Sequence, residues 1–117
     1  MTPDPQILSY VEQIRCWARK ERLVKRAFIY GSRAKGNYST SSDLDIAIEL
    51  PSPEANTNLA NFIFEHDRWK SDLMKAIQLD VDIQLLEIHN TNSIVYCGVS
   101  EKSILAYQTT EEARFHT

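Results

Sequence analysis

Apolar side chains recur along this chain with two different periods, which divide it into predicted helices and strands. From Pro5 to about Arg22, and again from Glu54 to about Ile77, they return at steps of three and four residues. That spacing places them on one face of a helix. The pattern therefore predicts two long amphipathic helices, the second beginning after the strand-ending Pro51 and Pro53.

Three other segments have the pattern of β-strands. Arg26–Tyr30 is short, apolar and aromatic, whereas Asp43–Leu50 and Asp80–Leu86 alternate between apolar and polar residues. Between the first two strands, residues 32–42 are rich in Gly, Asn, Ser and Thr, which predicts a turn and a loop.

The last third of the chain carries shorter patterns. We predict a short helix from about Asn92 to Cys97 and a short element over Ser103–Tyr107, and we expect the polar residues 109–117 to fray. With 117 residues, the chain has the length of one domain, so we expect a single compact α/β (α+β) domain over residues 1–117.

The charge and composition of the chain argue against several classes of function. Thirteen Lys and Arg against sixteen Asp and Glu give a net charge of −3, which disfavours non-specific wrapping of nucleic acid. Cys16 and Cys97 lie too far apart for a disulfide framework or a metal motif and are expected to be reduced thiols. The chain has no leader pattern and no long apolar run, so we expect a cytoplasmic protein without membrane contact.

The strand beginning DLD carries the candidate chemistry. Asp43 and Asp45 point the same way from the strand, and two carboxylates cannot be buried together without compensation. Mg²⁺ is the simplest compensation, because it binds carboxylate oxygens together with substrate phosphates, and two such ions promote phosphoryl displacement. The alternative interpretation is a strand with one solvated face.

The loop before this strand supplies a place for an anion. Gly31 permits close backbone approach, Ser32 adds a hydroxyl donor, and Arg33 and Lys35 add positive charge. A triphosphate resting on Gly31 and Ser32 would bring its metal ions to the carboxylates. A Gly-Ser pair is also common in ordinary turns, and Arg33 either contacts phosphate or pairs with an acid of the protein.

A third acid is expected on the strand Asp80–Leu86. Asp80 and Asp82 share the same parity, so alternation alone does not separate them. We choose Asp82 because it lies deeper in the strand, between Val81 and Ile83, whereas Asp80 suits a solvated strand start.

These residues resemble the motifs of the polymerase-β-like nucleotidyltransferase superfamily, most closely its minimal MNT-type members. The resemblance spans about residues 7–107 and rests on Gly31–Gly36, Ser42–Ile46 and Val81–Ile83. It implies a small mixed β-sheet flanked by helices, a nucleotide-binding role for Gly31, Ser32 and Arg33, and metal-binding and catalytic roles for Asp43, Asp45 and Asp82.

The resemblance also implies a Mg²⁺-dependent transfer of AMP from ATP. Minimal members resemble the antitoxin of HEPN/MNT toxin–antitoxin systems, in which the antitoxin modifies a tyrosine hydroxyl of a HEPN ribonuclease toxin. The expected partners are thus a nucleoside triphosphate and a HEPN-type toxin in a hetero-oligomer, with no direct nucleic-acid contact. The alternatives are an antitoxin that only binds and masks its partner, and a nucleotidyltransferase of the antibiotic-modifying type.

Overall fold

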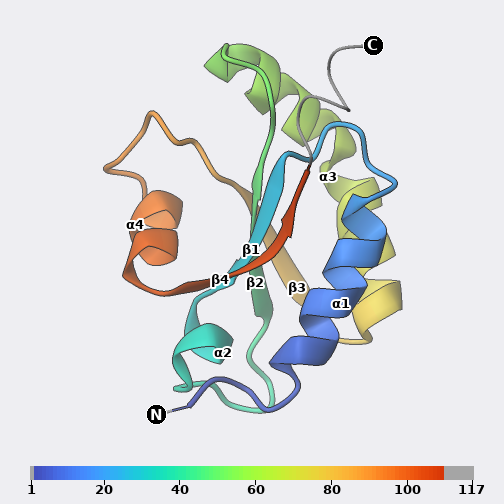
Figure 1. Ribbon diagram of the computed structural model, residues 1–117, viewed down its shortest axis with the longest axis vertical. Helices are drawn as coiled ribbons and strands as arrows, with labels where there is room; N and C mark the ends of the chain where they lie inside the picture. Colours follow the sequence, from blue (N-terminus) through green and yellow to red (C-terminus); the bar gives the residue numbers. More distant parts are fainter. Residues whose placement is uncertain (1, 110–117) are drawn as a thin grey trace.

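The computed structural model describes residues 2–109. Within that range the elements follow in the order α1 (Ile7–Ala18), β1 (Arg26–Tyr30), α2 (Ser32–Lys35), β2 (Leu44–Glu49), α3 (Ala55–Ile77), β3 (Val81–Leu85), α4 (Ile94–Glu101) and β4 (Ser103–Gln108). Figure 1 shows the strands between two groups of helices.

The predicted elements are all found, with corrections to their ends. The first helix ends at Ala18 and not near Arg22, because residues 19–22 carry charged side chains and form turns instead of continuing the apolar face. The loop predicted over residues 32–42 contains the short helix α2. The predicted helix ending at Cys97 continues to Glu101. The expected fraying of residues 109–117 is wrong for Thr109, which is buried and whose N–H donates to the carbonyl of Lys25 at 2.9 Å, and residues 110–117 lie outside the described residues.

The strands form one sheet in the order β3-β2-β1-β4. β1 pairs antiparallel with both β2 and β4, whereas β2 and β3 are parallel. Parallel neighbours need a long crossover, and the helix α3 supplies it. The sheet is therefore small and mixed, as expected.

The main core lies between the sheet and the helices α1 and α3, which cover the same side of it in Figure 1. Alternate residues of the strands point into this core, among them Ile29, Ile46 and Ile83, each of which is almost fully buried. Trp17 of α1 meets Trp69 of α3 edge to face, with ring centroids 5.7 Å apart. Burial of this apolar surface is the main force that holds the helices on the sheet.

A smaller cluster covers part of the opposite face. Tyr30, Ala47 and Leu86 are buried there, and Val95 and Val99 of α4 pack against them. Figure 1 shows α4 on the other side of the sheet from α1 and α3. The candidate site lies on this face, at the level of Tyr30.

Among residues 2–109, none of the helices combines the length and the apolar character that a bilayer-spanning segment needs.

Candidate functional site

Three neighbouring strands present polar side chains at one level of the sheet. In the register, Asp45 of β2 is paired with Tyr30 of β1 on one side and with Asp82 of β3 on the other. Residues directly opposite one another in adjacent strands project to the same face, so all three lie on the face that carries α4. Asp45 and Asp82 are half-buried, and Asp43, just before β2, is exposed.

The pairing of the strands therefore places Asp82, and not Asp80, beside Asp45. Asp80 precedes β3, is exposed, and contributes its backbone carbonyl, which accepts a hydrogen bond from the N–H of Leu44 (2.9 Å). Alternation in the sequence cannot distinguish the two acids, but the pairing of Asp45 with Asp82 does.

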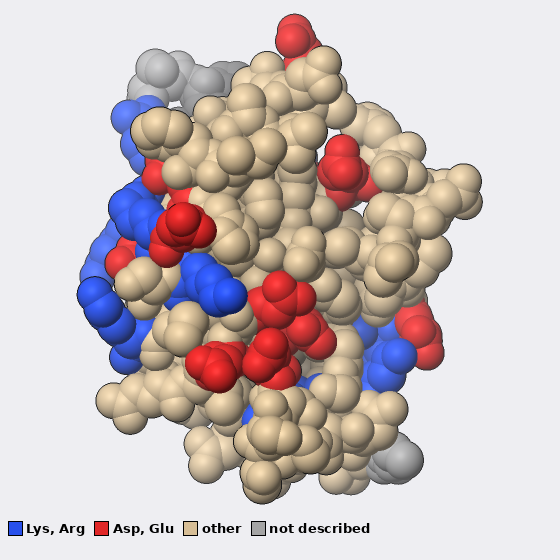
Figure 2. Space-filling view, turned by 180° about the vertical axis from the view of Figure 1, so that it is seen from behind, with Lys and Arg blue, Asp and Glu red and all other residues tan. Residues whose placement is uncertain are grey.

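The acids repel one another. Burial, followed by the charges of Asp82 and Asp43, raises the pKa of Asp45 to about 6. Burial and the charges of Asp45 and Asp82 likewise raise the pKa of Tyr30 to about 12. Among residues 2–109, no Lys or Arg forms an ion pair with any of the three acids. Figure 2 shows acidic side chains gathered near the middle of the face seen from behind.

This donor set suits a divalent cation by atom type and charge, because Mg²⁺ binds carboxylate oxygens and would compensate their repulsion. In the described part of the chain, however, no three His, Cys, Asp or Glu side chains are grouped closely enough to form a ready-made site. Asp82 instead accepts hydrogen bonds from Nε2 of Gln84, at 3.1 and 3.4 Å. The carboxylates are thus of the type that Mg²⁺ binds, but they are not arranged as a closed coordination shell.

The predicted phosphate-binding turn lies directly against Asp45. Gly31 has a φ of 76°, in the region that favours glycine, and a Cβ atom built on it would lie 2.1 Å from Oδ2 of Asp45. Ser32 follows as the first residue of α2 and is half-buried. The turn and the carboxylate, which are separated by a loop in the sequence, are therefore neighbours in space.

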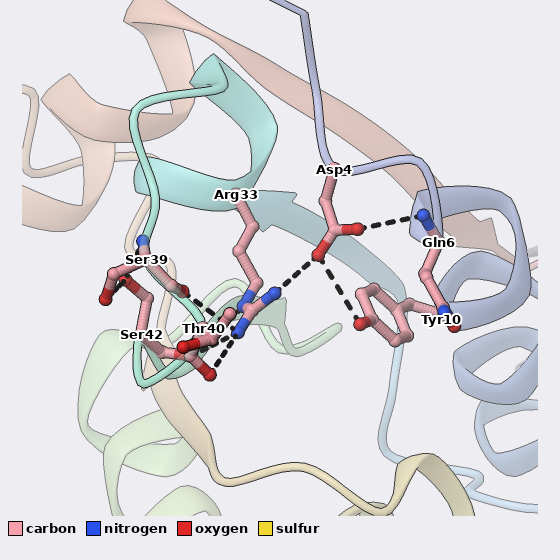
Figure 3. Close-up of polar contacts among 7 residues, drawn as sticks. All are labelled: Asp4, Gln6, Tyr10, Arg33, Ser39, Thr40 and Ser42. Carbon is pink, nitrogen blue, oxygen red and sulfur yellow. Dashed lines mark hydrogen bonds and ion pairs between the residues drawn. The ribbon is translucent and has the colours of Figure 1, made fainter.

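Of the two roles predicted for Arg33, contact with phosphate or pairing with an acid of the protein, the structure shows the pairing. Its side chain is buried, and Nη1 donates to Oδ2 of Asp4 (Figure 3). Nε and Nη2 donate to the backbone carbonyl of Ser42, at 3.0 and 2.8 Å. These contacts give no support to nucleotide binding by Arg33, and that role stays a prediction.

Sequence reasoning missed two residues of this region. Asp4 carries no signal in the hydrophobic pattern, and only the fold shows that it meets Arg33. Tyr30 was read only as an apolar strand residue, although it precedes Gly31 directly. In the structure its ring contacts Gly98 of α4, where an added Cβ would come within 3.0 Å of Cδ2.

The family model "Polymerase beta, Nucleotidyltransferase" matches residues 12–112. This is most of the chain, and the chain therefore belongs to that family. Comparison with curated proteins gives no match.

Solved structures with this fold include chains of toxin–antitoxin complexes. One complex contains AMP-PNP; the matching chain is 20% identical with a TM-score of 0.58, and the match covers 87% of this chain and 76% of that one. A mutant MntA–HpeT complex gives 18% identity and a TM-score of 0.58, covering 88% and 76%. The tri-AMPylated Shewanella oneidensis HEPN toxin in complex with MNT antitoxin gives 19% identity and a TM-score of 0.54, covering 92% and 76%. At these identities, the likeness shows the fold.

Proposed function

We propose that this chain is a Mg²⁺-dependent nucleotidyltransferase that moves AMP from ATP to a hydroxyl group. The observation that carries the proposal is the contact between the glycine turn at Gly31 and the carboxylate of Asp45, with Asp82 in register on the next strand. A triphosphate held at the turn would place its phosphates beside the acids. Membership in the nucleotidyltransferase family supports the same reaction class.

In the proposed mechanism, Asp43, Asp45 and Asp82 would hold Mg²⁺. When bound, the cation neutralises charge on the triphosphate and on the leaving pyrophosphate. The turn formed by Gly31 and Ser32 orients the phosphates, so that the acceptor oxygen approaches the α-phosphorus in line. A new P–O bond forms to the acceptor, the bond from the α-phosphorus to the bridging oxygen breaks, and pyrophosphate leaves. We assign Asp82 to accept the proton of the hydroxyl.

We propose further that the acceptor is a tyrosine of a HEPN-type ribonuclease toxin, bound in a hetero-oligomer, and that the modification neutralises it. This acceptor is supported by the fold shared with the chains of toxin–antitoxin complexes described above, one of which contains an AMPylated HEPN toxin. Asp43 is exposed and Asp45 and Asp82 are only half-buried, so a side chain of the partner can reach the carboxylates.

Transfer is tested with ATP labelled at the α-phosphate, Mg²⁺, and a helical HEPN protein encoded beside this chain. We expect label on the partner together with released pyrophosphate, and loss of both in the double variant Asp43→Ala, Asp45→Ala. Asp80→Ala is the matched control, because Asp80 is a nearby acid that the register excludes from the pair. No label with either Mg²⁺ or Mn²⁺ would overturn the proposed activity.

A second candidate, neutralisation by binding alone, is favoured by apolar side chains that project into solvent. Ile63 and Phe64 of α3 are 68% and 84% exposed, and Ile94 of α4 is 89% exposed. Such side chains favour contact with a partner. If the double alanine variant still neutralises the toxin in cells, binding alone is sufficient. Label appearing on a small molecule, with none on the protein, would instead indicate an antibiotic-type acceptor.

A further inference from the structure

A buried polar network joins the N-terminal segment to the loop before β2 (Figure 3). We call it the Asp4–Arg33 clamp; it consists of these two side chains and the backbone carbonyls of Ser39, Thr40 and Ser42. We propose that Arg33, oriented by Asp4, is a positioning residue that holds Asp43 in place for metal binding. The inference rests on the proposed function, since it assigns Asp43 to the metal.

The bonds from Arg33 converge on the loop. Its Nη2 donates to the carbonyls of Ser39 at 3.4 Å and Thr40 at 3.3 Å, and both Nε and Nη2 donate to that of Ser42. Ser42 is bonded covalently to Asp43, so the guanidinium fixes the peptide from which the Asp43 side chain projects. The fork of donors in arginine can hold several carbonyls at once, and the single ammonium of lysine cannot reproduce this geometry.

Asp4 holds the guanidinium at its other end. Only 4% of Asp4 is exposed, and both of its oxygens are occupied. Oδ1 accepts from the N–H of Gln6 at 2.8 Å, and Oδ2 accepts from Arg33 and from the hydroxyl of Tyr10 at 3.4 Å. The N–H of Asp4 also donates to the carbonyl of Arg33 at 3.0 Å. The acid is thus fixed by backbone and side-chain contacts together.

Burial leaves Arg33 poorly placed to bind a phosphate itself. It is 4% exposed, its charge is compensated by Asp4, and the ring of Tyr38 lies 5.0 Å from the guanidinium carbon. A buried ion pair commonly adds little net stability, because desolvation offsets the attraction. An apolar pair in place of Asp4 and Arg33 could match the stability of the ion pair, but it could not donate hydrogen bonds to the loop carbonyls. These hydrogen bonds are therefore the specific contribution of Arg33.

The segment that carries Asp4 is itself closely packed. A Cβ atom on Gly36 would lie 2.1 Å from the carbonyl oxygen of Thr2, and the φ of Gly36 is 95°. Gly36 therefore allows the N-terminal segment to lie against the end of α2, which places Asp4 within reach of Arg33.

The test compares Arg33→Lys with wild type by Mn²⁺ affinity, hydrogen exchange over residues 39–43, and melting temperature. Lysine keeps the charge that pairs with Asp4 but loses the fork. We expect Mn²⁺ affinity to fall by about 10-fold to 100-fold, as for other residues that orient metal ligands, and exchange in the loop to accelerate. Arg68→Lys is the matched control, because Arg68 forms a similar fork with Glu21 on another part of the molecule, at 3.1 and 2.9 Å. It should leave Mn²⁺ affinity unchanged.

A second variant separates positioning from folding. In Asp4→Leu, Arg33→Met, an apolar pair replaces the buried ions, which commonly preserves stability. We expect this variant to melt near wild type and still bind Mn²⁺ about 10-fold or more weakly. Wild-type affinity and wild-type loop exchange in either folded variant would overturn the inference.

The inference and the proposed function fail in different ways. Wild-type protein that binds Mn²⁺ but labels no acceptor would overturn the proposed transfer, while the affinities of the variants would still decide the role of the clamp. Wild-type protein that binds no Mn²⁺ would overturn the inference, because Asp43 would then have no metal to hold.

Discussion

Gly31 and Asp45 are in such close contact that no side chain fits between them. A Cβ atom at position 31 would lie 2.1 Å from the Oδ2 atom of Asp45, and the φ of 76° at Gly31 strains any residue with a side chain. Glycine is needed here for two reasons: the turn requires a positive φ, and the carboxylate of Asp45 leaves no room for a side chain. Changing it therefore alters both halves of the candidate site.

Gly31→Ala is expected to displace Asp45 as well as strain the backbone. We predict a destabilisation of about 1–3 kcal/mol, together with a large loss of Mn²⁺ affinity measured at a temperature where the variant is folded. Leu73→Ala is the control, because Leu73 is buried in the main core, on the other face of the sheet from the acids, so its loss destabilises the fold without removing a residue of the site. Equal losses of Mn²⁺ affinity in the two variants would contradict the specific role of Gly31.

Asp45→Asn is expected to stabilise the metal-free protein at neutral pH. The folded pKa of Asp45 is raised to about 6, whereas an unfolded Asp has a pKa of about 3.9. The folded protein therefore binds the proton more tightly, and the free energy of unfolding falls as pH rises from about 4 to about 6. Asparagine has no proton to lose, so the free energy of unfolding of the variant does not decrease over this pH range. We place the difference from wild type at about 1 kcal/mol after allowing for solvent screening at a half-buried group.

Melting curves recorded with EDTA check this prediction. The variant should melt about 4 °C above wild type at pH 7.5, and the difference should disappear near pH 4. A variant that melts below wild type at both pH values would show that the contacts of the Asp45 carboxylate stabilise the fold by more than its burial and the neighbouring charges destabilise it.

Metal binding is expected to weaken in mild acid. Because the pKa of Asp45 is about 6, a cation must displace a proton from this carboxyl at lower pH. We predict that Mn²⁺ affinity is constant above about pH 7 and decreases as the pH falls through 6. Titration calorimetry in two buffers of different ionisation enthalpy should detect the released proton. Affinity that does not change between pH 7 and pH 5 would contradict the prediction.

The long helix α3 offers a test of the core. Leu73 is fully buried, whereas Ile63 on the same helix is 68% exposed. Leu73→Ala should lower the free energy of unfolding by about 2–5 kcal/mol, because it removes buried apolar atoms and leaves a cavity. Ile63→Ala should change it by less than about 0.5 kcal/mol. Urea denaturation measures both changes in the free energy of unfolding. Similar decreases in the two variants would contradict the prediction, because they would show that Ile63 is packed as closely as Leu73.

Much of the fold could be predicted from periodicity. Strict alternation identified β2 and β3, and the steps of three and four apolar residues identified α1 and α3, because burial on one side imposes these periods. Periodicity did not identify α2, since its four residues are too few to show a period. The end of α1 was also misplaced, because charged residues are common in both helices and turns.

The sequence alone determined that Asp43 and Asp45 lie two residues apart at the start of one strand and that a glycine turn precedes them. This closeness along the chain required no tertiary information. Only the tertiary structure decided that Asp82, and not Asp80, pairs with Asp45, and that Arg33 meets Asp4. Both depend on the pairing of segments far apart in the chain, which follows from the packing of the whole domain and leaves no local pattern in the sequence.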